Sequence, residues 1–234
     1  MESSGFSADR DWHDDAMRLI DLSHTVTAGL VTYPGLPGPE ISDHLSFEDS
    51  HAAYAEGTEF TIGRISMVSN TGTYLDTPGH RHRGRHDLSG LALERCALLP
   101  AVVVDGPATG PVEASAFEGL DLAGTAVLLR TRWDAHFGTD RYGDPTHPYL
   151  ATDAAQLLVH AGVVLVGIDS VNIDDTQGGE RPVHTLLLDA DVPIVEHLTG
   201  LDQLPETSAT FTATPVKVAG MSTFPVRAFA VAPD

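Results

Sequence analysis

The sequence predicts a mixed α/β domain in which strands outnumber helices. Valine-rich apolar runs at 101–105, 125–131 and 162–169 are typical of central strands that are covered on both faces. The segment 59–68 alternates apolar and polar residues, which favours a further strand. The segment 151–162 has apolar residues at helical spacing. Turns rich in glycine and proline separate these segments.

The helices are fewer and have recognisable ends. In the longest one we expect Thr152 to cap the N-terminus and Gly162 to close the helix. Shorter helices are predicted at 112–120 and 182–190. Pro182 suits a first helical turn, because its missing N–H would have no partner inside a helix.

The remaining strands lie toward the two ends of the chain. The segment 19–26 opens the ordered region, and 211–218 and 224–231 are later strands. Proline cannot donate a hydrogen bond to a sheet, so Pro215 and Pro225 place those two segments at edges or bulges.

Composition restricts the class of partner. Asp plus Glu number 33 against 13 Lys plus Arg, which gives a formal net charge of −20. Such a polyanion repels nucleic acid and anionic membranes, so we expect a small-molecule partner and neither nucleic acid nor membrane. The one cysteine, Cys96, lies in an apolar context and is predicted to be a core thiol.

The length of 234 residues suits one domain. Residues 1–17 are acidic and polar, without the basic start and apolar run of a signal peptide. We therefore predict a flexible N-terminal arm at 1–17, a single domain at 18–234 and a cytoplasmic location.

The segment Ser69–Leu88 combines four groups that can bind a metal. Asp76, His80, His82 and His86 fall within eleven residues. A Pro-Gly pair forces a turn there, and a turn can direct a carboxylate and an imidazole at one divalent cation. The alternative is a solvated loop of histidines and arginines, which is the expected role of His82 and His86.

A second feature adds to this cluster. His184 and Glu196 flank an apolar stretch, with His184 in a predicted helix and Glu196 at the end of the run VPIVE. A buried carboxylate needs a partner. That partner is either a shared site with His184 or, alternatively, Arg227 or a turn that Glu196 caps.

These residues resemble the kynurenine formamidase, or cyclase, family. GTYLDTPGH is similar to that family's His-x-Gly-Thr-His-x-Asp-x-Pro-x-His signature, and the resemblance covers roughly residues 18–232. The other similar blocks follow in the family's order: LIDLSHTVTAGLVTYPG, VGIDSVNID, VHTLLLDADVPIVEHLTGL and TPVKVAGMSTFPVRAFA.

The resemblance implies a swivelling β/β/α domain with a mixed sheet, usually oligomeric. It implies a metal-dependent hydrolase acting on a non-peptide C–N bond. The substrate would be N-formylkynurenine, in the kynurenine pathway of tryptophan catabolism, or a related cyclic amide or lactone. It also implies that the aspartate and the later His and Glu bind metal, and that His80 serves in proton transfer.

The sequence departs from the signature at two positions, because Asn70 and Tyr74 replace the first two histidines. The resemblance leaves Asp76, His184 and Glu196 as metal ligands, enough for a site with an open position. We therefore expect either one divalent metal, zinc or manganese, or none.

The leading hypothesis is an arylformamidase-like hydrolase with His80, Tyr74 and Asp76 as catalytic residues. His80 would carry the proton, and Tyr74 would donate a hydrogen bond to the developing oxyanion. Tyr33 and Asn70 would bind substrate, with Tyr33, and also Trp133, able to stack on an aromatic ring.

Two other functions use the same residues. One is a metal-independent cyclase or dehydratase with His80 as the base. The other is a non-catalytic member of the family that binds a small molecule. The apolar C-terminal segment 224–231, as an edge or arm strand, further predicts a homo-oligomer, either a dimer or a tetramer; the alternative is that it closes the subunit's own sheet.

Overall fold

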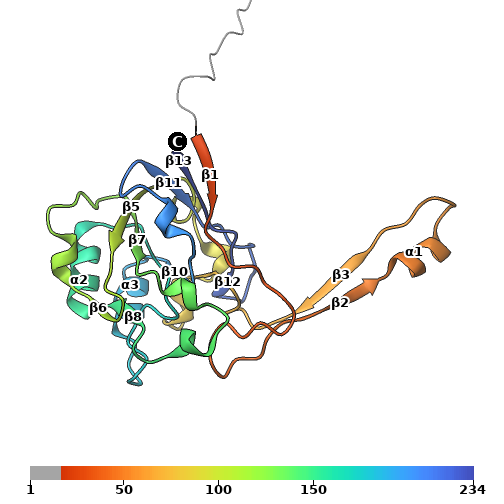
Figure 1. Ribbon diagram of the computed structural model, residues 1–234, viewed down its shortest axis with the longest axis horizontal. Helices are drawn as coiled ribbons and strands as arrows, with labels where there is room; N and C mark the ends of the chain where they lie inside the picture. The colour runs from red at the N-terminus through yellow and green to blue at the C-terminus, as the bar shows by residue number, and fades with distance from the viewer. Residues whose placement is uncertain (1–16) are drawn as a thin grey trace, which may run out of the picture.

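The computed structural model describes residues 17–234, so the predicted arm at 1–17 lies outside the described residues except for Met17, which begins strand β1. Within this range nine strands form one mixed sheet in the order β1-β13-β11-β5-β7-β9-β10-β4-β12 (Figure 1). Their bounds are β1 Met17–Asp21, β4 Tyr74–Asp76, β5 Leu99–Asp105, β7 Ala126–Arg130, β9 Leu165–Ile168, β10 Ile194–Glu196, β11 Ala209–Thr212, β12 Thr223–Pro225 and β13 Phe229–Pro233.

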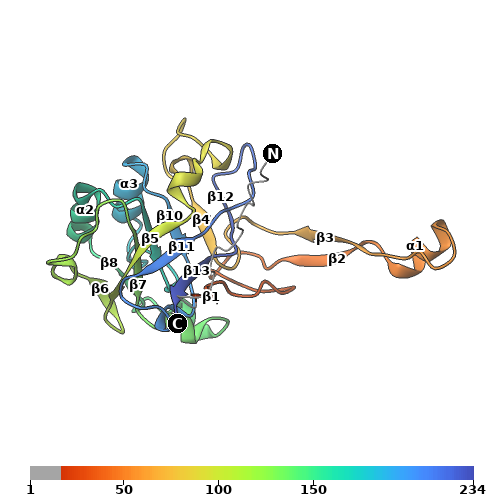
Figure 2. The ribbon, with the colours of Figure 1, turned by 90° about the horizontal axis from the view of Figure 1, so that it is seen from above.

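The valine-rich runs form the middle of the sheet, as predicted. β5, β7 and β9 pair in parallel, and β7 and β9 are buried almost throughout. Helices α2 (Thr152–Ala161) and α3 (Pro182–Asp189) cover one face, where Val127 and Val166 belong to the helices' core cluster (Figure 2).

The opposite face is covered by the sheet itself. Leu75 of β4, Val195 of β10, Phe211 of β11 and Ala230 of β13 all belong to one buried cluster. Strands from both ends of the sheet therefore share one core, which means that the sheet curls around it. This curled mixed sheet with helices on its outer face confirms the predicted fold class.

The helix ends differ slightly from the prediction. Thr152 lies inside α2, and the capping position falls on Ala151, whose side chain makes no capping bond. Gly162 closes α2 with φ of 77°, and Pro182 opens α3, both as predicted. The helix expected at 112–120 is only a 3-10 turn at Ala114–Phe117.

Shorter pieces complete the described chain. β6 (Gly110–Val112) and β8 (Pro148–Leu150) form a small parallel pair. Further 3-10 turns lie at Pro78–His80, Leu88–Gly90, Leu93–Arg95, Trp133–His136, Asp140–Gly143 and Leu201–Gln203. Within residues 17–234, no helix is long and apolar enough to cross a membrane.

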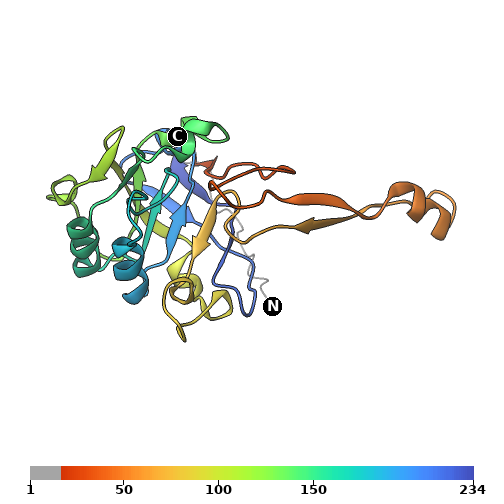
Figure 3. The same cartoon turned by 90° about the horizontal axis from the view of Figure 1, so that it is seen from below.

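The alternating segment 59–68 forms a strand, but not in the core. β3 (Ile62–Ser66) pairs with β2 (Glu40–Leu45), and helix α1 (Phe47–Ala53) lies at the tip between them. Figure 3 shows this arm extending far from the body. All five residues of β3 are exposed, so the alternation indicated the strand and not its surroundings.

The C-terminal strands are shorter than expected. β11 ends at Thr212, and Pro215 forms only an isolated bridge to Val226, because proline has no N–H to continue the pairing. Pro225 lies in β12 at the edge of the sheet, as predicted. The segment 224–231 is divided between β12 and β13. β11 and β13 have neighbours on both sides, so the predicted edge position is wrong for them, and β13 closes the subunit's own sheet.

Candidate active site

The pairing of β4 with β10 places three side chains on one face of the sheet. Tyr74 lies opposite Glu196, and Asp76 lies opposite Ile194. Side chains alternate between faces along a strand, so Tyr74, Asp76 and Glu196 point to the same side. All three are buried.

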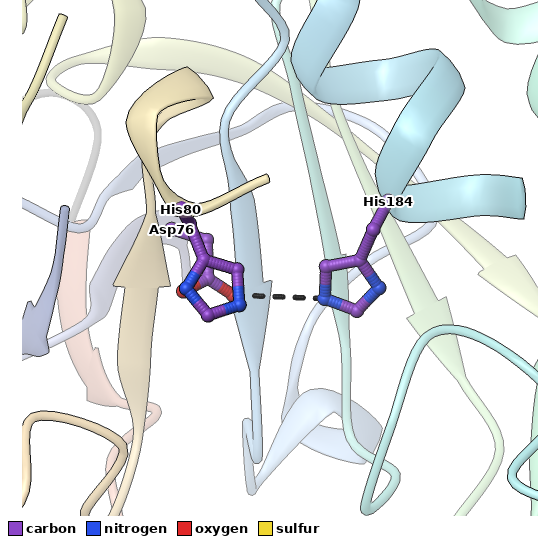
Figure 4. A group of neighbouring side chains, drawn as sticks. All are labelled: Asp76, His80 and His184. Carbon is purple, nitrogen blue, oxygen red and sulfur yellow. Dashed lines mark ion pairs between the residues drawn. The ribbon is translucent and has the colours of Figure 1, made fainter. Parts of the chain in front are cut away.

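Two histidines join this face from outside the sheet. The 3-10 turn after β4 brings His80 back beside Asp76, with Nδ1 of His80 3.7 Å from Oδ1 of Asp76. His184 enters from the first turn of α3 and faces Asp76 from the other side (Figure 4). The Pro-Gly turn is thus what brings the imidazole of His80 over the carboxylate.

Two carboxylate oxygens lie close to one ring nitrogen of His184. Nε2 of His184 lies 3.8 Å from Oδ2 of Asp76 and 3.7 Å from Oε1 of Glu196. The other ring nitrogen, Nδ1, lies 2.6 Å from Oδ2 of Asp174, which also accepts the backbone N–H of His184. Asp174 therefore orients the ring and leaves Nε2 directed at the two carboxylates, as an outer carboxylate does for a metal-binding histidine.

These atoms fit a divalent cation. Oδ2 of Asp76 is buried and has no hydrogen-bond partner within the described residues. An unpartnered buried carboxylate oxygen is costly, and a cation would satisfy it. Atoms of Asp76, His80 and His184 also lie within 4.8 Å of one another. Carboxylate oxygen with one or two imidazole nitrogens suits zinc and manganese.

The pKa shifts of the site residues indicate an excess of negative charge around His184. Burial would lower the pKa of His184, but the hydrogen bond to Asp174 and the nearby carboxylates of Asp76 and Glu196 raise it to about 10. Burial alone would raise the pKa of Asp76, yet the charges of His80 and His184 hold it below its usual value. In the absence of a metal, protonated His184 supplies the positive charge beside the carboxylates of Asp76 and Glu196.

The Tyr74 hydroxyl is hydrogen-bonded to Glu196. Its hydroxyl donates to Oε2 of Glu196 at 2.7 Å, and Nε2 of His197 lies 3.2 Å from the same hydroxyl. Burial and the charges of Glu196 and Asp76 raise the pKa of Tyr74 well above its ordinary value, so it stays protonated. The predicted hydrogen bond from Tyr74 to substrate would therefore require this proton to leave Glu196.

A cavity of about 400 Å³ opens above the ligand atoms. Tyr33 and Asn70, predicted to bind substrate, lie in its wall, together with His80, Tyr74, His184 and Glu196. Trp133 does not reach it, because the ring is 2% exposed and its Nε1 donates to the carbonyl of Tyr142. Such a volume suits a small molecule.

Other predicted groups lie away from the cavity. Nε2 of His82 lies 3.1 Å from the carbonyl of Thr185, and Nε2 of His86 lies 2.6 Å from Asp191. Arg227 pairs with Asp21 and not with Glu196. The alternative pairing of Glu196 with Arg227 is therefore wrong.

Sequence reasoning missed three supporting residues. The Thr223 hydroxyl bridges Oδ1 of Asp76 and Nδ1 of His80, Asp174 orients His184, and His197 contacts Tyr74. Thr223 and His197 carry no local pattern. Asp174 ends VGIDSVNID, and a carboxylate after an apolar run was the one available signal.

Comparisons of the sequence with known proteins give its family and relatives. A family described as "Putative cyclase" matches residues 20–175. The chain is 29% identical to a kynurenine formamidase of Salinibacter ruber over 91% of this chain and 96% of that protein.

Solved structures share the fold. Isatin hydrolase A from Labrenzia aggregata superposes with a TM-score of 0.80 at 23% identity, covering 93% of this chain and 94% of that one. A structure described as a potential metal-dependent hydrolase with cyclase activity gives 0.76 at 25% identity, covering 94% and 100%.

Proposed function

The chain belongs to the cyclase family. We propose that it is a metal-dependent hydrolase that cleaves the C–N bond of a small amide. The observation that carries the proposal is the position of Nε2 of His184 in the cavity wall, 3.8 Å from the unpartnered Oδ2 of Asp76 and 3.7 Å from Oε1 of Glu196. Its relatives include a kynurenine formamidase, so arylformamides are the first substrates to test.

Asp76, His184 and Glu196 would hold one divalent ion, zinc or manganese. A bound ion supplies Lewis acidity toward a carbonyl oxygen and lowers the pKa of water, from about 15.7 to about 7 in well-studied zinc enzymes. The pocket wall of Tyr33 and Asn70 would orient an aromatic amide beside it.

We assign to His80 the transfer of a proton from water to the departing nitrogen. Thr223 donates to Asp76, so its oxygen accepts Nδ1–H of His80 at 2.9 Å, and this leaves Nε2 as the nitrogen that exchanges a proton. In hydrolysis, water gives a proton to Nε2 of His80 as its oxygen adds to the carbonyl carbon; the C–N bond then breaks, and His80 passes that proton to the departing nitrogen. Imidazole performs such transfers near neutral pH.

The two alternative functions are not favoured. A metal-independent cyclase or dehydratase would leave Oδ2 of Asp76 buried and unpartnered through its cycle. A non-catalytic binder would have no use for Asp174, which orients His184 toward the carboxylates.

We further propose a homo-oligomer, a dimer or a tetramer, and a cytoplasmic location. The arm supports assembly. Ile41 lies opposite Ile65 in the β2–β3 ribbon, and each side chain is 50% exposed. Two-stranded ribbons are marginal alone in water, and exposed apolar strips mark interfaces. A second copy presents the same strip, which permits symmetric pairing.

Assembly and activity are tested separately. Light scattering should give at least twice the chain mass of 24.8 kDa, and Ile65→Asp should lower it, whereas Ser42→Asp on the same ribbon should not. A mass near one chain for the unmodified protein would contradict assembly. For activity, purified protein should hydrolyse N-formylkynurenine or isatin and lose that activity in chelator. Cleavage of only phosphoesters or glycosides would overturn the proposed function.

A further inference from the structure

A chain of three buried side chains runs behind the candidate metal site. The Tyr142 hydroxyl lies 2.8 Å from Nδ1 of His197, and Nε2 of His197 lies 3.2 Å from the Tyr74 hydroxyl, which donates to Oε2 of Glu196 at 2.7 Å. Their exposures are 3% for Tyr142, 0% for His197 and 2% for Tyr74. Tyr142 and His197 are therefore shielded from water, and only the Tyr74 end of the chain borders the cavity.

The direction of each bond follows from proton counting. Tyr74 has one hydroxyl proton and gives it to Glu196, so its oxygen must accept from Nε2–H of His197. A neutral imidazole with Nε2–H has a bare Nδ1, which accepts the proton of Tyr142. The chain is therefore fully satisfied in one direction only, from Tyr142 to Glu196.

Both oxygens of Glu196 are held as a result. Oε2 accepts from Tyr74, and Oε1 accepts the backbone N–H of Ile173 at 2.7 Å. Oε1 is also the oxygen that faces Nε2 of His184 at 3.7 Å. Without the bond to Tyr74, the carboxylate could rotate about its last torsion and withdraw Oε1 from that direction.

The backbone at His197 is consistent with a requirement for this ring. His197 has φ of 57°, the left-handed region that costs a side-chain-bearing residue about 1 kcal/mol or more. The surrounding fold maintains that conformation directly after β10. It places the ring between Tyr142 and Tyr74.

We propose that Tyr142, His197 and Tyr74 are positioning residues that fix Glu196 so that Oε1 alone faces the ion site. The inference rests on the proposed function, because it assumes that Glu196 binds a metal. Tyr74 stands where the family signature has an imidazole, so here a ligand position has become part of the support for another ligand.

The test is metal affinity, measured by titrating chelator-treated protein with manganese chloride in a calorimeter. Tyr74→Phe should raise the dissociation constant for manganese about 10- to 100-fold, as loss of an outer hydrogen bond does in other metal sites. Tyr142→Phe, two bonds further away, should weaken it in the same direction by less. Tyr149→Phe is the matched control, because no hydrogen bond of its hydroxyl is found within residues 17–234, and it should leave affinity unchanged.

A second measurement needs no metal. Nitrogen NMR of the histidine rings in chelator-treated protein should show His197 as the Nε2–H tautomer. This tautomer should persist in Tyr142→Phe, where Nε2–H still donates to Tyr74, and should give way to a mixture in Tyr74→Phe. An Nδ1–H tautomer in the unmodified protein would overturn the inference, as would unchanged manganese affinity in both Tyr74→Phe and Tyr142→Phe. Unmodified protein that binds no manganese or zinc would overturn the proposed function as well, which distinguishes the two failures.

Discussion

Replacing His80 with alanine separates its chemical role from its structural one. The His80 side chain is 35% exposed, and the one hydrogen bond its ring makes within residues 17–234 joins Nδ1 to Thr223. Losing one such bond costs about 1 kcal/mol of folding stability. Losing a general acid–base group lowers turnover by about 10²-fold or more, which corresponds to about 2.7 kcal/mol on the barrier. The effect on rate should therefore exceed the effect on stability.

The assay is release of the arylamine from an N-formylated aniline, followed by absorbance, together with urea denaturation of the same samples. Added imidazole should restore part of the turnover of His80→Ala, because the ring borders the open cavity. His82→Ala is the control, since His82 contacts the carbonyl of Thr185 and not the cavity. Full activity of His80→Ala on a validated substrate would refute the proposed proton transfer.

Three further predictions concern metal content, the support of Asp76 by Thr223, and the pH dependence of stability. Asn70→His combined with Tyr74→His restores both signature imidazoles and should raise the metal content toward two ions per chain; elemental analysis that still gives one would contradict this. Thr223→Val removes the donor to Asp76 and should lower turnover and stability together, by about 1–3 kcal/mol in unfolding free energy; unchanged stability in urea would count against it. Burial lowers the pKa of His24 to about 4, against about 6.5 when unfolded. The unfolded chain therefore takes up a proton that the folded chain resists, and stability falls as the pH drops from about 6.5 toward 4. His24→Phe should lose less stability than the unmodified protein between about pH 7 and pH 5 in urea denaturation, and equal losses would refute the assignment.

The central sheet could be predicted because its signal is local. The runs around Val103, Val127 and Val166 are continuous and apolar, and such runs become strands that are covered on both faces. The three-residue strands β4 and β10 had no such signal, because a strand that short shows no periodicity. Their pairing is nevertheless what brings Tyr74 beside Glu196.

The candidate site could be predicted only in part. Asp76 and His80 lie four residues apart around a Pro-Gly turn, so their proximity was readable from the chain. Glu196 and Thr223 lie on β10 and β12, the two strands that pair with β4, although they are 120 and 147 positions further along the chain than Asp76. Glu196 was indicated by its place at the end of an apolar run and then assigned to the metal by the resemblance, whereas an isolated threonine gives no such indication.

In the β2–β3 arm, the strand was predictable but its surroundings were not. The alternation over 59–68 predicts a strand wherever that strand lies. In β3, Ile62 and Ile65 are three residues apart and point to opposite faces of the ribbon, and all five residues of the strand are exposed. Sequence periodicity therefore indicates the strand and not its surroundings.

The most direct test of the account is the metal content of the purified protein, measured with activity before and after chelation. We predict one zinc or manganese per chain, bound by Asp76, His184 and Glu196, with activity lost in chelator and restored by the same metal. In matched variants, Glu196→Gln and His184→Ala should bring the content close to zero, and His86→Ala should leave it at one. Two ions per chain, a lone ion bound instead by His80, His82 and His86, or full activity in chelator would contradict it.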